Sequence, residues 1–208
     1  MFNRHLQLWQ DWNRDNSGPF GDLFTGQIDL SSIGMIGHSR GGDAVARYAS
    51  DDAGVPPLLP ISAMVLFAPV LPITGETPDP PPIPTVITEG TCDGDVSNDP
   101  SGYVRDKLLE PDGSTVMITV AGANHNFFNT EWSPSTGRPD GIDDGDQAGS
   151  PQSPCTPAVP RLSETEQRTL AVKIAARTFN AAAQDLSITS ALSTLPAEFP
   201  SATVHAYG

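Results

Sequence analysis

Four short apolar runs alternate with segments of helical periodicity, and this alternation constrains the fold more than any other feature of the chain. The runs are rich in aliphatic and β-branched residues and cover residues 33–37, 63–68, 84–89 and 115–120. An apolar run without polar alternation is typical of a strand that is covered on both faces. Strands that alternate with helices predict an α/β fold with a mostly parallel sheet and flanking helices.

The segments around these runs carry helix signals. Helices are predicted at residues 2–14, 41–50 and 103–109 and in a long segment that begins after Ser163. Ser163 and Glu166 have the spacing of a capping box, in which each side chain bonds the backbone N–H of the other residue. We therefore expect one domain over residues 1–186, with a long irregular loop at 129–160 and an irregular tail at 187–208.

The charge balance excludes two classes of partner. The chain has 208 residues, enough for one domain with a buried core, and a net charge of −14 at pH 7. Such a surface repels phosphate backbones and anionic lipid headgroups, so neither nucleic acid nor a membrane surface is an expected partner. No apolar run is long enough to span a bilayer, and the first residues lack the apolar stretch and cleavage site of a signal peptide.

The pentapeptide Gly37-His38-Ser39-Arg40-Gly41 matches the pattern G-x-S-x-G. It lies between a predicted strand and a predicted helix, which is the context that a nucleophile elbow requires. The hydroxyl of Ser39 would then project at the N-terminus of a helix, where backbone N–H groups stabilise a developing oxyanion. A chance match in a Gly-rich loop is the competing interpretation, and the strand-turn-helix context favours Ser39 as a nucleophile.

A serine nucleophile needs a base, and His125 is the best placed of the four histidines. His5 precedes the predicted core, His205 lies in the tail, and the side chain of His38 must point away from the adjacent Ser39. His125 follows the carboxyl end of the fourth predicted strand, the edge at which parallel sheets form their sites. A structural histidine in a loop is the alternative.

The third member should be a carboxylate at the end of the third predicted strand, and residues 90–96 offer Asp93 and Asp95. Asp93 lies nearer the end of the strand and Gly94 lets the following chain turn away, so Asp93 is favoured and Asp95 stays open. Either could instead belong to an acidic surface turn. The carboxylate would hold the imidazole in the correct tautomer and stabilise the imidazolium. Ser, Asp, His is the order in which α/β-hydrolases carry a triad.

Three motifs together resemble the secreted bacterial α/β-hydrolases, which are related to the platelet-activating-factor acetylhydrolase, chlorophyllase and dienelactone-hydrolase-like serine esterases. The motifs are Gly37-His38-Ser39-Arg40-Gly41-Gly42, Cys92-Asp93-Gly94-Asp95-Val96-Ser97 and Asn124-His125-Asn126-Phe127-Phe128-Asn129. The resemblance covers residues 1–183 and implies ester hydrolysis through an acyl-enzyme, with no metal and no organic cofactor. It also implies a secreted protein and a disulfide between Cys92 and Cys155, a pairing that two cysteines alone leave open.

The chain departs from this family at its start. In the α/β-hydrolase fold several strands precede the helix that comes before the nucleophile strand, whereas this chain begins at that helix. We therefore expect N-terminal strands to be missing, through a fragment, a misplaced start or the need for a partner. The backbone of Arg40 would supply one oxyanion N–H, and the missing part the second. A bare sheet edge predicts self-association.

An acidic segment and a group of aromatic residues could each have either a functional or a purely structural role. The acidic segment 140–146 could hold calcium, but it lacks the ligand spacing and the closing glutamate of an EF-hand loop. A solvated acidic loop is therefore favoured, and no metal is expected. Phe127, Phe128 and Trp132 follow the predicted base and could line a substrate pocket together with His38, or could be ordinary packing.

Taken together, the sequence predicts a serine esterase or lipase-like hydrolase that acts on a small-molecule or lipid ester, with Ser39, Asp93 and His125 as its triad. Two alternatives stay open. One is an inactive, truncated hydrolase that serves as a binding module or is a non-functional fragment. The other is an acyltransferase or a peptidase on the same triad.

Overall fold

The computed structural model describes residues 1–15, 18–50, 56–70, 78, 81–96, 114–146, 155 and 159–206. The strands are β1 (Ile33–His38), β2 (Ile61–Phe67), β3 (Thr85–Gly90), β4 (Thr115–Val120) and β5 (Ala202–Ala206). The α-helices are α1 (Phe2–Arg14), α2 (Arg40–Ala49), α4 (Glu164–Ala183), α5 (Ile188–Leu192) and α6 (Leu195–Glu198). Three short 3₁₀ helices are η2 (Asn126–Phe128), η3 (Pro134–Thr136) and η4 (Asp144–Asp146).

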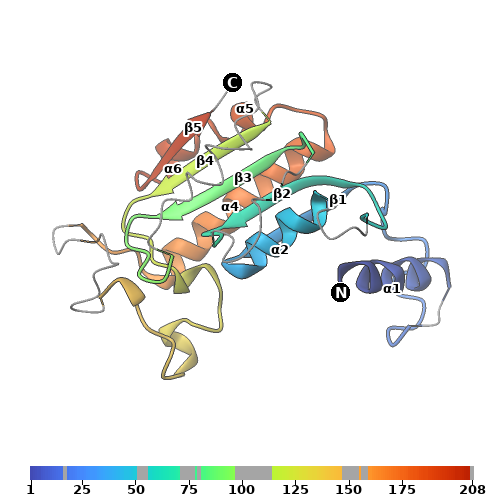
Figure 1. The fold of residues 1–208 in the computed structure, drawn as a ribbon, viewed down its shortest axis with the longest axis horizontal. Helices are drawn as coiled ribbons and strands as arrows, with labels where there is room; N and C mark the ends of the chain where they lie inside the picture. Colours follow the sequence, from blue (N-terminus) through green and yellow to red (C-terminus); the bar gives the residue numbers. More distant parts are fainter. Residues whose placement is uncertain are drawn as a thin grey trace.

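The strands form one mostly parallel sheet, which confirms the predicted α/β class. Their order is β1-β2-β3-β4-β5, with β1 to β4 parallel and β5 antiparallel to β4. All four strands expected from the apolar runs are present within two residues of their predicted bounds. The carboxyl ends of β1 to β4 therefore meet at one edge of the sheet, where the loops between β4 and α4 also lie (Figure 1).

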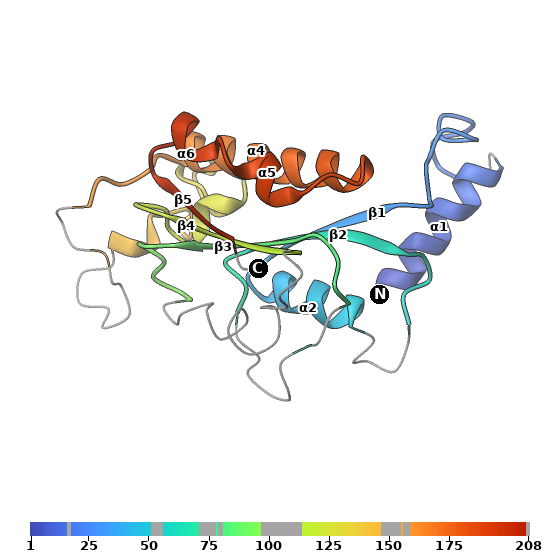
Figure 2. The same cartoon turned by 90° about the horizontal axis from the view of Figure 1, so that it is seen from above.

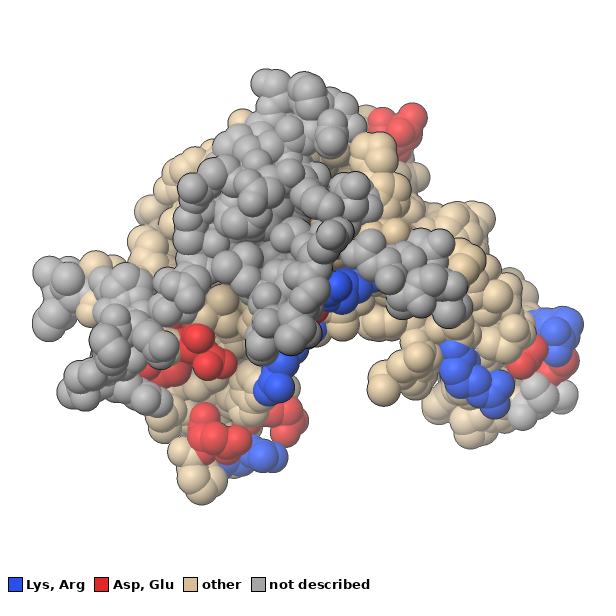
Figure 3. Space-filling model, viewed as in Figure 1, with Lys and Arg blue, Asp and Glu red and all other residues tan. Residues whose placement is uncertain are grey.

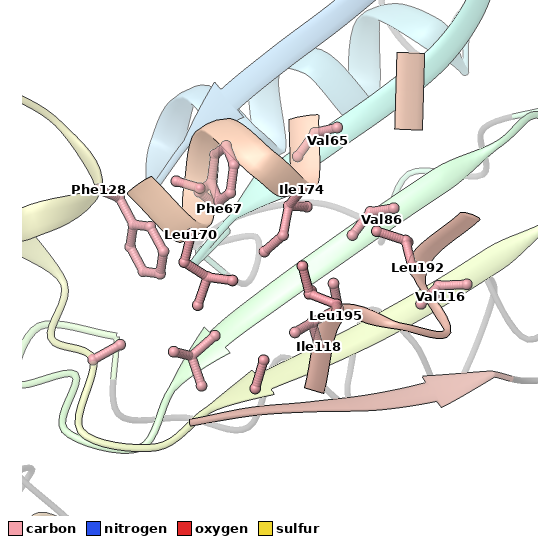
Figure 4. Close-up of a cluster of buried hydrophobic side chains, with 14 of the residues drawn as sticks. Val65, Phe67, Val86, Val116, Ile118, Phe128, Leu170, Ile174, Leu192 and Leu195 are labelled. Carbon is pink, nitrogen blue, oxygen red and sulfur yellow. The ribbon is translucent and has the colours of Figure 1, made fainter. Parts of the chain in front are cut away.

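Helices cover both faces of this sheet. Helices α4, α5 and α6 lie over one face and α2 lies over the other (Figure 2). Because successive residues of a strand point to opposite faces, Val65 and Phe67 pack toward α4, whereas Met64 and Leu66 pack toward α2. The cluster under α4 is the larger of the two. Figure 4 shows how Leu170 and Ile174 of α4 lie against side chains of the sheet such as Val86 and Ile118.

The start of α4 is set by its capping box, as the sequence predicts. The hydroxyl of Ser163 accepts the backbone N–H of Glu166, and the carboxylate of Glu166 accepts the backbone N–H of Ser163. Both bonds satisfy N–H groups that have no partner inside a helix. The helix then runs along the sheet and buries Leu170 and Ile174.

The prediction of an irregular tail at 187–208 is wrong for the residues that the structure describes. Residues 188–206 form α5, α6 and β5. The side chains of Ile188, Leu192 and Leu195 are buried against the main core, and β5 covers the edge of β4. The two helices have five and four residues, too short for a 3.6-residue period to show in the sequence. Pairing with β4, not local propensity, is what makes β5 a strand.

Helix α1 lies beyond the β1 end of the sheet (Figure 2). The rings of Trp9 and Trp12 pack edge-on against Phe24 and Phe20 of the following turn. Strand β1 pairs only with β2 among the described residues, and Ile36 on it is 53% exposed.

The predicted helix at 103–109 lies outside the described residues. Within the described part of the chain, no helix is both long and apolar enough to cross a membrane.

Candidate functional site

Ser39 occupies a tight turn between β1 and α2. Its backbone has φ 57° and ψ −127°, a conformation that residues with a side chain rarely adopt. The turn is held by a bond from the N–H of Ser39 to the carbonyl of Phe67, 3.0 Å long, and by the N–H of Gly42, which donates to the carbonyl of Ser39 at 2.9 Å. The strand-turn-helix context expected for the motif is therefore present.

Gly37 is needed for this turn because strand and helix come very close there. A Cβ atom at Gly37 would lie 2.3 Å from the carbonyl oxygen of Gly41. At Gly42 it would lie 2.8 Å from the Cβ of Pro69. Only hydrogen fits at these two positions, so the backbone of α2 starts directly against the end of β1.

Asp93 and His125 form a buried pair at the ends of β3 and β4. The Nδ1 of His125 lies 2.9 Å from Oδ2 of Asp93, and both side chains are buried. The second oxygen of Asp93 accepts the backbone N–H groups of Asp95 and Val96 at 3.0 and 2.6 Å. These bonds hold the carboxylate in one orientation, so that it fixes the ring and the tautomer of His125.

The structure distinguishes Asp93 from Asp95, the two carboxylates that the sequence offers as the third member of the triad. Asp93 binds Nδ1 of His125, whereas Oδ2 of Asp95 lies 3.6 Å from Nε2 on the opposite side of the ring. The side chain of Asp95 is 72% exposed. Asp93 therefore has the contact expected of an orienting carboxylate, and Asp95 does not.

Ser39 and His125 are not joined by a hydrogen bond among the described residues. Nε2 of His125 is buried and has no hydrogen-bond partner there. His38, which directly precedes Ser39 in the chain, lies beside His125, and their ring centres are 4.6 Å apart. The structure thus brings Asp93 and His125 into contact and places Ser39 on the adjoining turn.

The pKa of His125 is raised above its ordinary value. Burial alone lowers the pKa of this imidazole, but the hydrogen bond that it donates to Asp93 and the negative charges of Asp93, Asp95 and Asp144 outweigh that cost. These surroundings therefore stabilise the protonated, imidazolium form of His125.

His38 is neutral in the same surroundings. Burial, followed by the charge of His125, lowers the pKa of His38 to about 4. Its Nε2–H donates to the backbone carbonyl of His125 at 3.0 Å. Whether His38 contacts a substrate stays a prediction, since its polar contacts are made with the loop that carries His125.

The loop around His125 is held by residues that sequence reasoning missed. The side chain of Gln167, buried on α4, accepts the N–H of Asn124 at 3.0 Å and donates to its carbonyl at 2.7 Å. The side-chain oxygen of Asn124 accepts the N–H of Phe127. Gln167 stands one turn before Leu170 on the inward face of the helix, and a polar residue at an inward position is the signal that could have found it.

The acidic segment 140–146 is not a solvated loop at its centre, and that prediction is wrong for two of its residues. Asp143 pairs with Arg161 and accepts the side-chain N–H of Asn124 at 3.0 Å. Asp144 is buried and accepts two backbone N–H groups. Asp140 lies at the surface beside Arg138. Contacts with Arg161 and with the loops that follow β3 and β4 therefore bury the middle of the segment.

The aromatic residues after the base differ from one another. Phe128 belongs to the main core and stacks on Phe67 with ring centres 5.3 Å apart, so its packing is structural. Phe127 is also buried. Trp132 is partly exposed, and its ring lies 5.8 Å from that of His38 and 6.5 Å from that of His125. The ring of Phe128 also lies 6.1 Å from that of His38, so Phe128 and Trp132 both border the site, and Trp132 is the more exposed of the two.

Cys92 and Cys155 form a disulfide, as the family resemblance implies. Cys92 directly precedes Asp93, so the bond ties the loop of the orienting carboxylate to a segment 63 residues further along the chain.

The remaining features concern charge and metals. Asp and Glu side chains gather over the segment between β4 and α4 on the face that Figure 3 shows. Among the described residues, no three His, Cys, Asp or Glu side chains form a group that could hold a metal ion.

Arg40 is the first residue of α2, so its backbone N–H lies at the helix N-terminus beside Ser39.

Comparison with known proteins gives no family for this chain. No protein-family model matches it, and no curated protein matches it.

Proposed function

We propose that this chain is a serine hydrolase of the α/β-hydrolase type that cleaves carboxylic esters through an acyl-enzyme. The observation that supports this most strongly is the buried Asp93–His125 pair, 2.9 Å apart, at the sheet edge where Ser39 occupies its strained turn. Three chemically matched residues come from three different strand ends. A purely structural histidine would not need that combination.

In the proposed reaction, Oγ of Ser39 attacks the ester carbonyl while Nε2 of His125 takes its proton. The carbonyl oxygen becomes an oxyanion, which the backbone N–H of Arg40 stabilises at the start of α2. The tetrahedral intermediate collapses, and the alcohol leaves with the proton from His125. Water then attacks the acyl-Ser39 ester and gives a proton to His125. When this second intermediate collapses, His125 returns that proton to Oγ of Ser39 and the carboxylic acid is released.

Asp93 stabilises the imidazolium of His125 during both steps. Its carboxylate stays ionised and accepts the Nδ1–H, so Nε2 is the nitrogen that faces the reaction. The hydroxyl of Ser39 has to reach Nε2 when substrate binds, since catalytic hydrogen bonds are commonly loose without substrate.

The disulfide supports a protein that matures in an oxidising compartment, and export is part of this proposal. The substrate is a small-molecule or lipid ester. Self-association through β1, whose Ile36 side chain is exposed, stays a prediction.

One observation favours a second function, that of a non-catalytic binding module. Nε2 of His125 lacks a hydrogen bond from Ser39 among the described residues, and the carboxylate of Asp95 lies 3.6 Å from it. A histidine held between two carboxylates favours its protonated form, in which Nε2 is not available to take a proton from a serine. An acyltransferase or a peptidase would use the same triad with another acceptor or leaving group.

A fluorophosphonate probe tests the proposal because it bonds covalently only to an activated serine. We expect the wild-type chain and the Ser193→Ala control, which changes an exposed serine near the C-terminus, to be labelled. Ser39→Ala should not be labelled, and its hydrolysis of p-nitrophenyl acetate and butyrate should fall by about 10³-fold or more. A folded wild-type chain that resists the probe would exclude the hydrolase and leave the binding module.

A further inference from the structure

Asp144 is a buried carboxylate that the proposed reaction does not use. It is only 6% exposed, although ionised side chains are seldom buried unless they are partnered. It lies in the acidic segment between β4 and α4, far along the chain from Asp93.

The two oxygens of Asp144 bind two different loops of the site. Oδ2 accepts the backbone N–H of Gly94 at 2.6 Å, and Oδ1 accepts the backbone N–H of Asn126 at 3.1 Å. Gly94 follows Asp93 directly, and Asn126 follows His125 directly. One carboxylate therefore spans the residue after the orienting acid and the residue after the base.

We propose that Asp144 is the positioning residue that couples the Asp93 loop to the His125 loop and sets the geometry of that pair. The inference rests on the proposed function of the pair. Asp93 and His125 come from neighbouring strand ends, and their loops are already joined by their own contact and by the N–H of Cys92, which donates to the carbonyl of Ala123 at 2.9 Å. Asp144 adds a link on the far side of the pair, at the residues that follow Asp93 and His125. A carboxylate bonded to both backbones links their movements, as supporting residues do when they hold a reacting group in place.

The chemistry of the contact requires a carboxylate. An ionised carboxylate carries only acceptors, so it can satisfy both N–H donors at once. An amide at the same position has one acceptor oxygen and would turn its NH₂ group toward the other N–H donor. Asp144→Asn should therefore break one of the two bonds while it preserves the shape of the side chain.

The backbone of Asp144 also packs directly on the Asp93 loop. A Cβ atom at Gly94 would lie 2.3 Å from the carbonyl oxygen of Asp144. One at Gly145 would lie 2.3 Å from the carbonyl oxygen of Cys92. Glycine at these two positions lets the segments touch along their backbones, so the contact is close enough to transmit position.

Asp144 acts on His125 through its charge as well. Its carboxylate is one of three, with Asp93 and Asp95, whose charges raise the pKa of His125, while the neighbouring ring of His38 is neutral. The pKa of Asp144 itself is raised, by burial and by the charge of Asp93. The two backbone N–H bonds and the charge of His125 lower this pKa but do not cancel the rise. Removal of the Asp144 charge should therefore make His125 easier to deprotonate.

The test compares Asp144→Asn with Asp140→Asn, which removes the same charge from the same segment at a side chain that is 54% exposed. The pKa of His125 is measured by NMR of the imidazole without substrate, together with amide hydrogen exchange at Gly94 and Asn126. In Asp144→Asn we expect the pKa to fall by about half a unit to one unit and both amides to exchange about tenfold faster. Asp140→Asn should change neither, and a purely structural role would not move the pKa.

A second measurement needs no variant. Hydrogen-bond scalar couplings from the amide nitrogens of Gly94 and Asn126 to the carboxyl carbon of Asp144 in the wild-type chain report both contacts, even if Asp144→Asn does not fold. Missing couplings, or an unchanged pKa of His125 in folded Asp144→Asn, would overturn the inference. Neither readout uses turnover, so failure of probe labelling at Ser39 would reject the hydrolase and leave this result to be judged separately.

Discussion

The imidazole of His38 is a residue-scale feature that affects how the folded chain responds to pH. It lies beside the rings of His125 and Trp132, donates Nε2–H to the carbonyl of His125, and has Nδ1 3.4 Å from the side-chain nitrogen of Asn129. Nδ1 must be unprotonated to accept that amide N–H. Protonation would place two donors against each other in a buried position, so the folded chain keeps His38 neutral.

This neutrality predicts a loss of stability in acid. Burial lowers the pKa of folded His38 to about 4, so between pH 6.5 and 4 the unfolded chain binds a proton that the folded chain does not. The stability that neutral His38 contributes is complete above pH 6.5 and is lost toward pH 4, by roughly 3 kcal/mol for a shift from 6.5 to about 4.

Urea unfolding of the wild type and His38→Gln at several pH values checks this. The variant lacks the titrating group, so the difference between the two free energies of unfolding should shrink as the pH falls. Subtracting the two profiles cancels the opposite contribution of Asp144, whose raised pKa favours the folded state in acid. A difference that stays constant with pH would contradict the assignment.

At the scale of elements, the junction of β1 and α2 determines the placement of Ser39. The two glycines of the pentapeptide play different parts in it. Gly37 faces the backbone of Gly41 so closely that a Cβ atom has no room, whereas a Cβ atom at Gly41 would meet nothing within 4 Å. The motif therefore contains one sterically required glycine and one that packing tolerates replacing.

The comparison of Gly37→Ala with Gly41→Ala follows from this difference. We expect Gly37→Ala to lower the free energy of unfolding by about 3 kcal/mol or more, because strand and helix must separate. Gly41→Ala should raise it by about 0.5–1 kcal/mol, since alanine favours the helix in which Gly41 lies. Chemical denaturation followed by circular dichroism measures both, and equal destabilisation by the two variants would argue against the tight junction.

At the scale of the whole molecule, one covalent bond connects parts that are distant in the sequence. The disulfide between Cys92 and Cys155 closes a loop with a sequence separation of 63 residues. This loop contains β4 and His125, the proposed base, so the bond constrains the unfolded chain and also anchors the Asp93 loop.

Removal of this bond should cost substantial stability. For a loop of this length the chain-entropy estimate is about 4 kcal/mol in the free energy of unfolding. We expect the double variant Cys92→Ser, Cys155→Ser to show this loss in urea, compared with the oxidised wild type. The reduced wild type serves as the control for the substitutions and should behave like the variant. A loss below about 1 kcal/mol would mean that the bond contributes little to folding.

Features that depend on neighbouring residues could be predicted from the amino-acid sequence alone. They include the strand that ends just before Ser39, the strand Thr115–Val120, the capping box at Ser163 and the mostly parallel sheet. Each depends on a period, a cap or a turn spanning a few residues, and such patterns are written locally. The strand-end positions of Asp93 and His125 followed from the same patterns, because parallel strands end at a common edge.

Contacts between side chains that are far apart in the chain depend on the tertiary structure. It placed Asp93 on Nδ1 of His125 and Asp95 on the far side, and it buried Asp144 against Gly94, 50 residues away in sequence. It also made residues 202–206 a strand by offering them the edge of β4. These outcomes have no local signature, because the bonds join backbones that approach each other only when the sheet has formed.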